Sequence, residues 1–213
     1  MNSERPFILC LTGSLGMGKS RTASFFAEAG VPVYDSDAAV HALYAGEAAP
    51  LIESAFPGTT SDGKVDRTRL AAKVLGDDAA LARLEAIVHP LVSKARDAFL
   101  AEAQAYGAPV VLLDVPLLFE TGGERGCDAV VVVSAPPDVQ RRRAFERPGM
   151  TEEKFAVLVG KQMPDVEKRR RADFIVDSSQ SFDHARAQVR DILQAIAKMR
   201  ARRADSPDER GPR

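Results

Sequence analysis

The chain has 213 residues, of which 45% are hydrophobic and 28% are charged, so it carries enough apolar side chains for a buried core. Its length fits one domain with an elaboration, or a core domain with inserted subdomains. The formal net charge of −1 argues against an extended nucleic-acid or membrane surface. No apolar run approaches the roughly 18 residues of a membrane span, and the N-terminal sequence MNSERPF does not resemble a signal peptide. We therefore expect a cytoplasmic protein without nucleic-acid or membrane partners, as a monomer or small homo-oligomer.

Five short segments are predicted as β-strands. Three of them are apolar runs rich in Val, Ile and Leu that do not alternate with polar residues, a pattern typical of strands covered on both faces. Two others are weaker. The three strong strands are Phe7 to Leu11, Val110 to Asp114 and Ala129 to Val133, and the weaker ones are Val31 to Tyr34 and Phe174 to Val176.

Helical patterns lie between these strands. Strands that alternate with helices predict a three-layer α/β fold with a mostly parallel sheet. The predicted helices are Ser20 to Ala29, Ser36 to Tyr44, Ala79 to Tyr106, Pro137 to Arg147, Thr151 to Gln162 and Phe182 to Arg200.

The spacing of the strands predicts insertions. The largely helical stretch between Tyr34 and Val110 is far longer than the dozen or so residues that one crossover needs. The polar tail from Ala201 has no apolar periodicity and is expected to be disordered. We predict a core formed by 1–37, 107–137 and 171–200, a helical insertion at 38–106, a second helical excursion at 138–170, and a disordered tail at 201–213.

The two cysteines are Cys10, in an apolar run, and Cys127, just before another. Their spacing suggests neither a metal site nor a disulfide framework. We interpret both as reduced packing residues.

The string GSLGMGKS from Gly13 to Ser20 matches the phosphate-binding pattern G-x-x-x-x-G-K-[ST]. It follows a predicted strand and opens a predicted helix, where glycines let successive N–H groups point at one anion and the helix N-terminus adds partial positive charge. Lys19 can reach the β- and γ-phosphates of ATP, and the Ser20 hydroxyl can bind Mg²⁺. The expected nucleotide contacts in this region are Gly13, Ser14, Gly16, Met17, Gly18, Lys19, Ser20 and Arg21.

Carboxylates follow two of the predicted strands. Asp35 and Asp37 come after VPVY, and Asp114 ends VVLLD. Ligands of open α/β sheets bind at this carboxyl edge, and a phosphoryl acceptor needs a carboxylate to orient its hydroxyl and take the proton. Asp35 and Asp114 are both candidates for that base. Helix capping is the alternative for Asp35 and Asp37, and a water-mediated Mg²⁺ contact is the alternative for Asp114.

Basic residues gather in the second excursion. Arg143 and Arg147 are four residues apart in QRRRAFER and would share one helix face. Over the phosphates they would neutralise charge in the transition state, whereas the alternative is a solvated face paired with nearby glutamates. We interpret the run KRRR at 168–171 as a surface run.

His89 and Pro90 lie in IVHPLV, within a long helical pattern that the proline is expected to kink or restart. His89 is either a packed histidine at that break or a substrate contact. His41 follows Asp37 by four residues and suits a pair on the helix surface.

Several separated strings together resemble the dephospho-CoA kinase family: GSLGMGKS, YDSDAAVH, IVHPLV, DVPLLFE, QRRRAFER and ADFIVDSS. The resemblance covers nearly the whole chain up to about Arg200. It implies an adenylate-kinase-like core of five parallel strands, an insertion that holds the CoA moiety, and a lid. It also implies transfer of the γ-phosphoryl group of ATP·Mg²⁺ to the 3′-hydroxyl of dephospho-CoA, the last step of CoA synthesis.

The resemblance places the catalytic carboxylate on Asp35 and makes Arg143 a lid contact to the phosphates. The shared helix face adds Arg147 as a second expected contact. Lys19 completes the catalytic set, and Ser20 is the expected Mg²⁺ ligand. The family commonly has Thr where this chain has Arg21, which leaves contacts to the α-phosphate open. The expected acceptor contacts are Asp35, Asp37, His41, His89, Pro90, Asp114 and Leu117.

Two other functions remain possible from the sequence. One is another small-molecule or nucleotide kinase on the same scaffold. The other is a nucleotide-dependent regulatory or RNA-binding protein that uses the basic runs, which would show salt-sensitive RNA binding.

Overall fold

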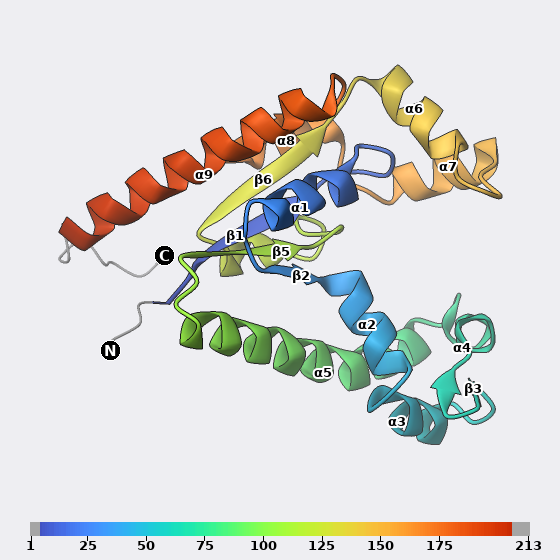
Figure 1. The fold of residues 1–213 in the computed structure, drawn as a ribbon. Helices are drawn as coiled ribbons and strands as arrows, with labels where there is room; N and C mark the ends of the chain where they lie inside the picture. The colour runs from blue at the N-terminus through green and yellow to red at the C-terminus, as the bar shows by residue number, and fades with distance from the viewer. Residues whose placement is uncertain (1–4, 206–213) are drawn as a thin grey trace. The chain divides into compact units, whose positions relative to one another are not determined.

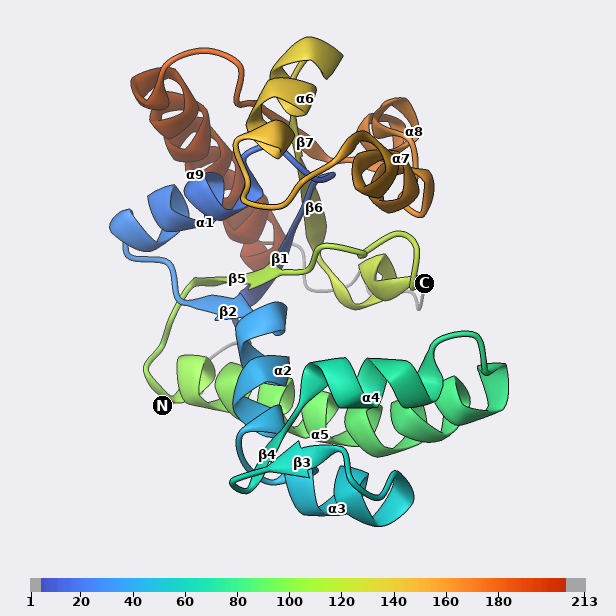
Figure 2. The same ribbon diagram turned by 90° about the vertical axis from the view of Figure 1, so that its right-hand side faces the viewer.

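The computed structural model describes residues 5–205, and the side chains of residues 5–202. The chain consists of two compact units (Figures 1 and 2). The first unit joins the residues up to Val33 to those from Gly107 onward, and the second is Tyr34–Tyr106. No helix in the described part of the chain is long and apolar enough to cross a membrane.

A five-stranded sheet forms the centre of the fold. Its order is β2-β5-β1-β6-β7, and β1 pairs in parallel with β5 and β6, as β6 does with β7. The strands are β1 (Phe7–Thr12), β2 (Val33–Asp35), β5 (Val110–Asp114), β6 (Ala129–Ser134) and β7 (Phe174–Asp177). The parallel α/β class and all five predicted strands are therefore confirmed.

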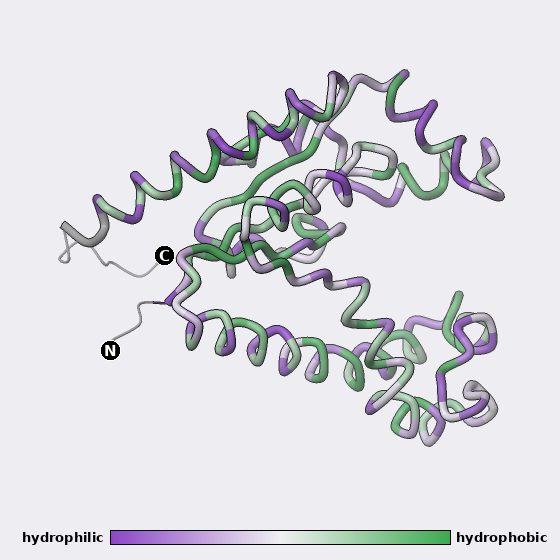
Figure 3. The backbone as a smooth tube through the Cα atoms, in the orientation of Figure 1, coloured by the Kyte–Doolittle hydropathy of each residue, from purple (hydrophilic) through white to green (hydrophobic). Residues whose placement is uncertain are grey.

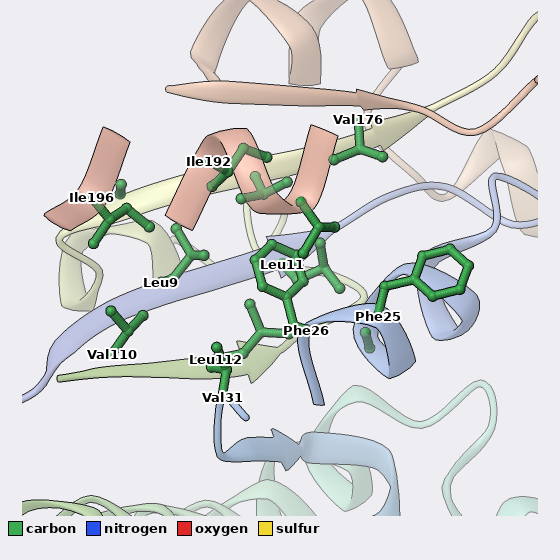
Figure 4. Packing of buried hydrophobic residues seen from close by; sticks show 14 of the residues in the cluster. Leu9, Leu11, Phe25, Phe26, Val31, Val110, Leu112, Val176, Ile192 and Ile196 are labelled. Atoms are coloured by element: carbon green, nitrogen blue, oxygen red, sulfur yellow. The ribbon is translucent and has the colours of Figure 1, made fainter. Parts of the chain in front are cut away.

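The core of the first unit lies between the sheet and two helices. Side chains at alternate positions of the strands, such as Leu9, Leu11 and Leu112, pack against Phe26 and Ile196 (Figure 4). In Figure 3 the backbone of β6 is coloured mostly hydrophobic, and all six of its residues are buried, as expected for a strand covered on both faces. The helices of this unit are α1 (Lys19–Glu28), η1 (Gly123–Gly126), α6 (Pro137–Phe145), α7 (Glu152–Gly160), α8 (Asp165–Arg171) and α9 (Phe182–Asp205).

The second unit has its own apolar core. Ile52, Leu70, Leu84 and Val88 are buried together there. Its elements are α2 (Ser36–Tyr44), α3 (Ala48–Ala55), β3 (Thr60–Ser61), β4 (Lys64–Val65), α4 (Arg67–Val74) and α5 (Asp78–Ala105).

Some local predictions are wrong. The helix does not restart at the exposed Pro90, because α5 continues through it as one 28-residue helix, while the predicted kink at this residue stays a prediction. α9 continues to Asp205, so residues 201–205 are helical rather than disordered, while the rest of the predicted tail lies outside the described residues. A hairpin, β3–β4, interrupts the predicted helical insertion.

The prediction of two reduced cysteines is also wrong. Cys10 and Cys127 form a disulfide, with their Cα atoms 5.9 Å apart. Parallel pairing explains this proximity, because Asp128 donates its N–H to the Ile8 carbonyl and so brings Cys127 beside β1. A separation of 117 residues conceals that proximity in the sequence.

Candidate active site

The phosphate-binding loop, defined as Gly13–Ser20, connects β1 to α1. Gly16 and Gly18 have φ values of 79° and 87°, a left-handed conformation that favours glycine. Gly18 is the N-cap of α1, and because glycine has no side chain it leaves the first N–H groups of the helix uncapped. The loop can therefore present backbone N–H groups and a helix N-terminus to an anion.

α6 packs closely against this loop. A Cβ atom on Gly16 would lie 2.5 Å from the carbonyl oxygen of Gln140, so the contact admits only glycine. The amide Nε2 of Gln140 donates to the Leu15 carbonyl at 2.9 Å, and the Leu15 N–H donates to Oε1 of Gln162 at 3.0 Å. Two glutamines thus hold both backbone polar groups of Leu15.

Lys19 and Asp114 come together at the carboxyl edge of the sheet. Nζ of Lys19 lies 2.5 Å from Oδ1 of Asp114, whose residue is only 3% exposed. The end of β1 is also tied to the loop after β5, because the Thr12 hydroxyl donates to the Pro116 carbonyl at 2.9 Å. Leu117 follows in that loop and is 43% exposed.

Arg143 reaches the phosphate-binding loop through Ser178. Its Nη1 and Nη2 atoms donate to Oγ and to the carbonyl of Ser178, at 2.9 and 2.7 Å. The Ser178 hydroxyl in turn donates to the Met17 carbonyl at 2.7 Å. Arg147, which was expected beside it, is exposed beyond the end of α6. Arg143 is therefore held against the loop rather than paired with nearby glutamates.

Ser20 and Arg21 begin the exposed side of α1. Ser20 is exposed, and the guanidinium of Arg21 lies 5.1 Å from the ring centroid of Phe182, the first residue of α9. Stacking on an aromatic ring accounts for an arginine at this position.

The second unit carries the remaining predicted residues. Asp35 is the N-cap of α2, where Oδ1 accepts from the Ala38 N–H at 2.9 Å, so the capping interpretation holds for Asp35 and not for Asp37 in the first turn. Nε2 of His41 lies 2.7 Å from a guanidinium nitrogen of Arg67. His89 is exposed, like Pro90, which excludes the packed histidine.

Sequence reasoning missed three residues that hold the loop: Gln140, Gln162 and Ser178. Each had a weak signal, because Gln140 lies in QRRRAFER, Ser178 lies in ADFIVDSS, and Gln162 ends the predicted helix of the excursion. Their contacts to Leu15 and Met17 span more than a hundred residues of sequence, which no local pattern displays.

A five-stranded parallel sheet with this loop after β1 defines a P-loop nucleotide-binding fold, which kinases and nucleotide hydrolases share. The structure matches TT1252 from Thermus thermophilus with a TM-score of 0.78 and 33% identity, covering 90% of this chain and 98% of that one. It matches a dephospho-CoA kinase from Campylobacter jejuni with a TM-score of 0.66 and 24% identity, covering 91% and 98%. A shikimate kinase from Acinetobacter baumannii shares the fold, with a TM-score of 0.52 at 19% identity and coverage of 91% and 94%.

The family follows from sequence. The family model described as dephospho-CoA kinase matches residues 7–184. The dephospho-CoA kinase of Bradyrhizobium diazoefficiens is 60% identical over 92% of this chain and 99% of its own length, and that of Mesorhizobium japonicum is 61% identical over 91% and 98%. The chain belongs to the dephospho-CoA kinase family and is an ATP-dependent kinase.

Proposed function

We propose that the chain transfers the γ-phosphoryl group of ATP to the ribose 3′-hydroxyl of dephospho-CoA, giving CoA and ADP. The observation that carries the proposal is a phosphate-binding loop with a poised lysine in a chain that matches dephospho-CoA kinases over almost its full length. The loop binds the phosphates through its N–H groups, and Lys19 neutralises charge on the β- and γ-phosphates.

The oxygen donors near Lys19 suit Mg²⁺. Ser20 offers a hydroxyl at the start of α1 and Asp114 a carboxylate at the end of β5, and Mg²⁺ prefers few protein oxygens beside water and phosphate. In the described residues no group of three or more His, Cys, Asp or Glu side chains is placed to hold a metal ion. Ser20, and Asp114 through water, would hold the ion, which neutralises phosphate charge when bound.

Asp35 is the better of the two candidate bases. Asp114 is buried, and its Oδ1 is already engaged in the ion pair with Lys19. Asp35 is exposed at the end of β2, and only Oδ1 is used in its cap, so Oδ2 remains available to orient and deprotonate a hydroxyl.

The helical insertion at 38–106 is proposed to bind dephospho-CoA, together with Asp37 directly before it. The acceptor is long, and Asp37, His41, His89 and Pro90 are all exposed. Residues 138–170 are proposed as the lid, whose closure would exclude water. Arg143 would either leave Ser178 and bind the phosphates, or stay on Ser178 and support the phosphate-binding loop from there. Leu117 is the proposed acceptor contact from the loop after β5.

The substrate assignment is tested by ADP release. Purified protein with ATP and Mg²⁺ should release ADP with dephospho-CoA and not with shikimate, gluconate or nucleosides. Comparable turnover of another acceptor, with little on dephospho-CoA, would instead support the other small-molecule kinase. Salt-sensitive RNA binding without kinase activity would support the RNA-binding protein.

The base is tested by Asp35→Asn. Asparagine keeps the cap of α2 but removes the base, so turnover should fall about 100-fold or more while ATP binding persists. Asp62→Asn, at an exposed hairpin residue of the same unit, is the matched control. Full activity of Asp35→Asn would move the base to Asp114.

A cytoplasmic location is proposed from the sequence alone. The disulfide between Cys10 and Cys127 is unusual for a reducing compartment. Thiol titration of the protein from cells lysed in an alkylating reagent will show whether the bond forms in the cell.

A further inference from the structure

Lys168 is a charged side chain with no exposed surface. It lies in the middle of α8, and Nζ is 2.8 Å from Oε1 of Glu120, which is 16% exposed. Burying an ammonium group is costly unless a counter-ion lies beside it. Glu120, the last residue of DVPLLFE, is that counter-ion.

The same carboxylate holds the chain beside α8. Oε1 of Glu120 also accepts the backbone N–H of Met163 at 2.7 Å. One oxygen thus joins the buried ammonium to the segment between α7 and α8. α8 is short and otherwise mostly exposed, and at its first residue Oδ2 of Asp165 accepts the Ser134 hydroxyl of β6 at 2.8 Å. The Glu120–Lys168 pair is a second polar contact of this segment with the core, and it acts directly beside Met163.

Gln162 is the residue next to this anchor. Its Oε1 accepts the N–H of Leu15 in the phosphate-binding loop, whereas Gln140 donates to the carbonyl of the same residue. Leu15 directly precedes Gly16, the left-handed residue packed against α6. The position of Gln162 therefore bears on the curvature of the loop.

We propose that Glu120, Lys168 and Gln162 are positioning residues for ATP. The ion pair holds the chain at Met163, and Gln162 then holds Leu15 and the curvature of the phosphate-binding loop. The inference deepens the proposed function, because it rests on that loop being the ATP site. None of the three residues needs to touch ATP.

The first test is Gln162→Met, which keeps the length of the side chain and removes the hydrogen-bond acceptor. The KM for ATP should rise about five- to tenfold, as expected for one lost hydrogen bond, while kcat and the KM for dephospho-CoA change less than about twofold. Lys161→Ala, at the exposed neighbour, is the matched control. An unchanged KM for ATP in a folded Gln162→Met protein overturns the proposal.

The second test is coupling between the anchor and Gln162. Lys168→Met should also raise the KM for ATP, and the double variant should be no worse than the more affected single variant, because both act through Leu15. Independent, multiplying effects overturn the proposal. Arg169→Met removes an exposed charge from the same helix as a control. If Lys168→Met does not fold, Glu120→Gln takes its place in the cycle, and Gln162→Met alone still decides.

Failure of the proposed function gives a different result. Lys19→Ala should abolish ATP binding if the loop is the ATP site. ATP binding that survives Lys19→Ala refutes the site itself, whereas loss of binding there with a normal Gln162→Met refutes only the positioning role.

Discussion

Ser178 takes part in three hydrogen bonds that link α6 to the phosphate-binding loop, two through its hydroxyl and one through its backbone carbonyl. Ser178→Ala removes the hydroxyl that joins Arg143 to Met17, so we expect the KM for ATP to rise about tenfold, with Arg143 keeping only its bond to the Ser178 carbonyl. Ser179→Ala is the neighbouring control, because the Ser179 side chain contacts Asp177 instead. Steady-state kinetics and ATP titration measure the effect, and equal kinetics of the two variants would contradict it.

Glu120 predicts a dependence of stability on pH. Burial raises the pKa of its carboxyl, but the adjacent Lys168 ammonium and the hydrogen bond from the Met163 N–H lower that pKa by more, so it lies below its usual value. A carboxyl with a lowered folded-state pKa stabilises the fold above its unfolded pKa of about 4.3, and that stability is lost as the pH falls through the folded-state value. Thermal melts from pH 6 downward should therefore show a loss of stability in acid, and this loss should be smaller in Glu120→Gln than in the unaltered protein. An identical acid limb in both proteins would refute this assignment.

At the scale of elements, the strands were predictable because each of the five is a short apolar run that can be recognised without information from distant residues. The β3–β4 hairpin was missed although Asp62 and Gly63, both with positive φ, form the Asp-Gly pair typical of a two-residue turn. The four basic residues of KRRR in α8 predict a solvated surface run, but Lys168 is fully buried. Burial of Lys168 depends on Glu120, and no local pattern reveals that partner.

The close contact between Gly16 of the phosphate-binding loop and Gln140 of α6 leads to a prediction for Gly16→Ala. In Gly16→Ala the positive φ costs about 1–2 kcal/mol, and the new Cβ also meets the Gln140 carbonyl, which should add at least about 1 kcal/mol and weaken ATP binding. Gly30→Ala is the matched control, since Gly30 has a φ of 84° and open space around it. Chemical denaturation of both variants isolates the contact, and equal losses of stability would show that α6 yields freely.

At the scale of the molecule, sequence predicted the fold class and much of the loop chemistry, because Gly16, Lys19 and Ser20 lie in one contiguous motif. It did not predict which partners hold that motif in place. Gln162 and Ser178 contact the motif only because the fold brings distant segments of the chain together. Asp114 was predicted as a candidate base, but its ion pair with Lys19 was not predicted. Contiguous chemistry is visible in one sequence, whereas contacts between distant segments require the fold.

At this scale, the largest effect on stability is expected from the disulfide between Cys10 and Cys127. It closes a loop of 117 residues across β1 and the start of β6, and restricting the unfolded chain in this way should stabilise the fold by about 2–4 kcal/mol, with an entropic upper estimate of about 5 kcal/mol. Cys127→Ser should lower the free energy of unfolding by that amount, and dithiothreitol should do the same to the unaltered protein but have no effect on the variant. Because Cys127 lies at the far end of β6 from the phosphate-binding loop, the KM for ATP should hardly change. Denaturation curves with and without reductant measure this, and a variant as stable as the oxidised protein would show that the bond contributes nothing.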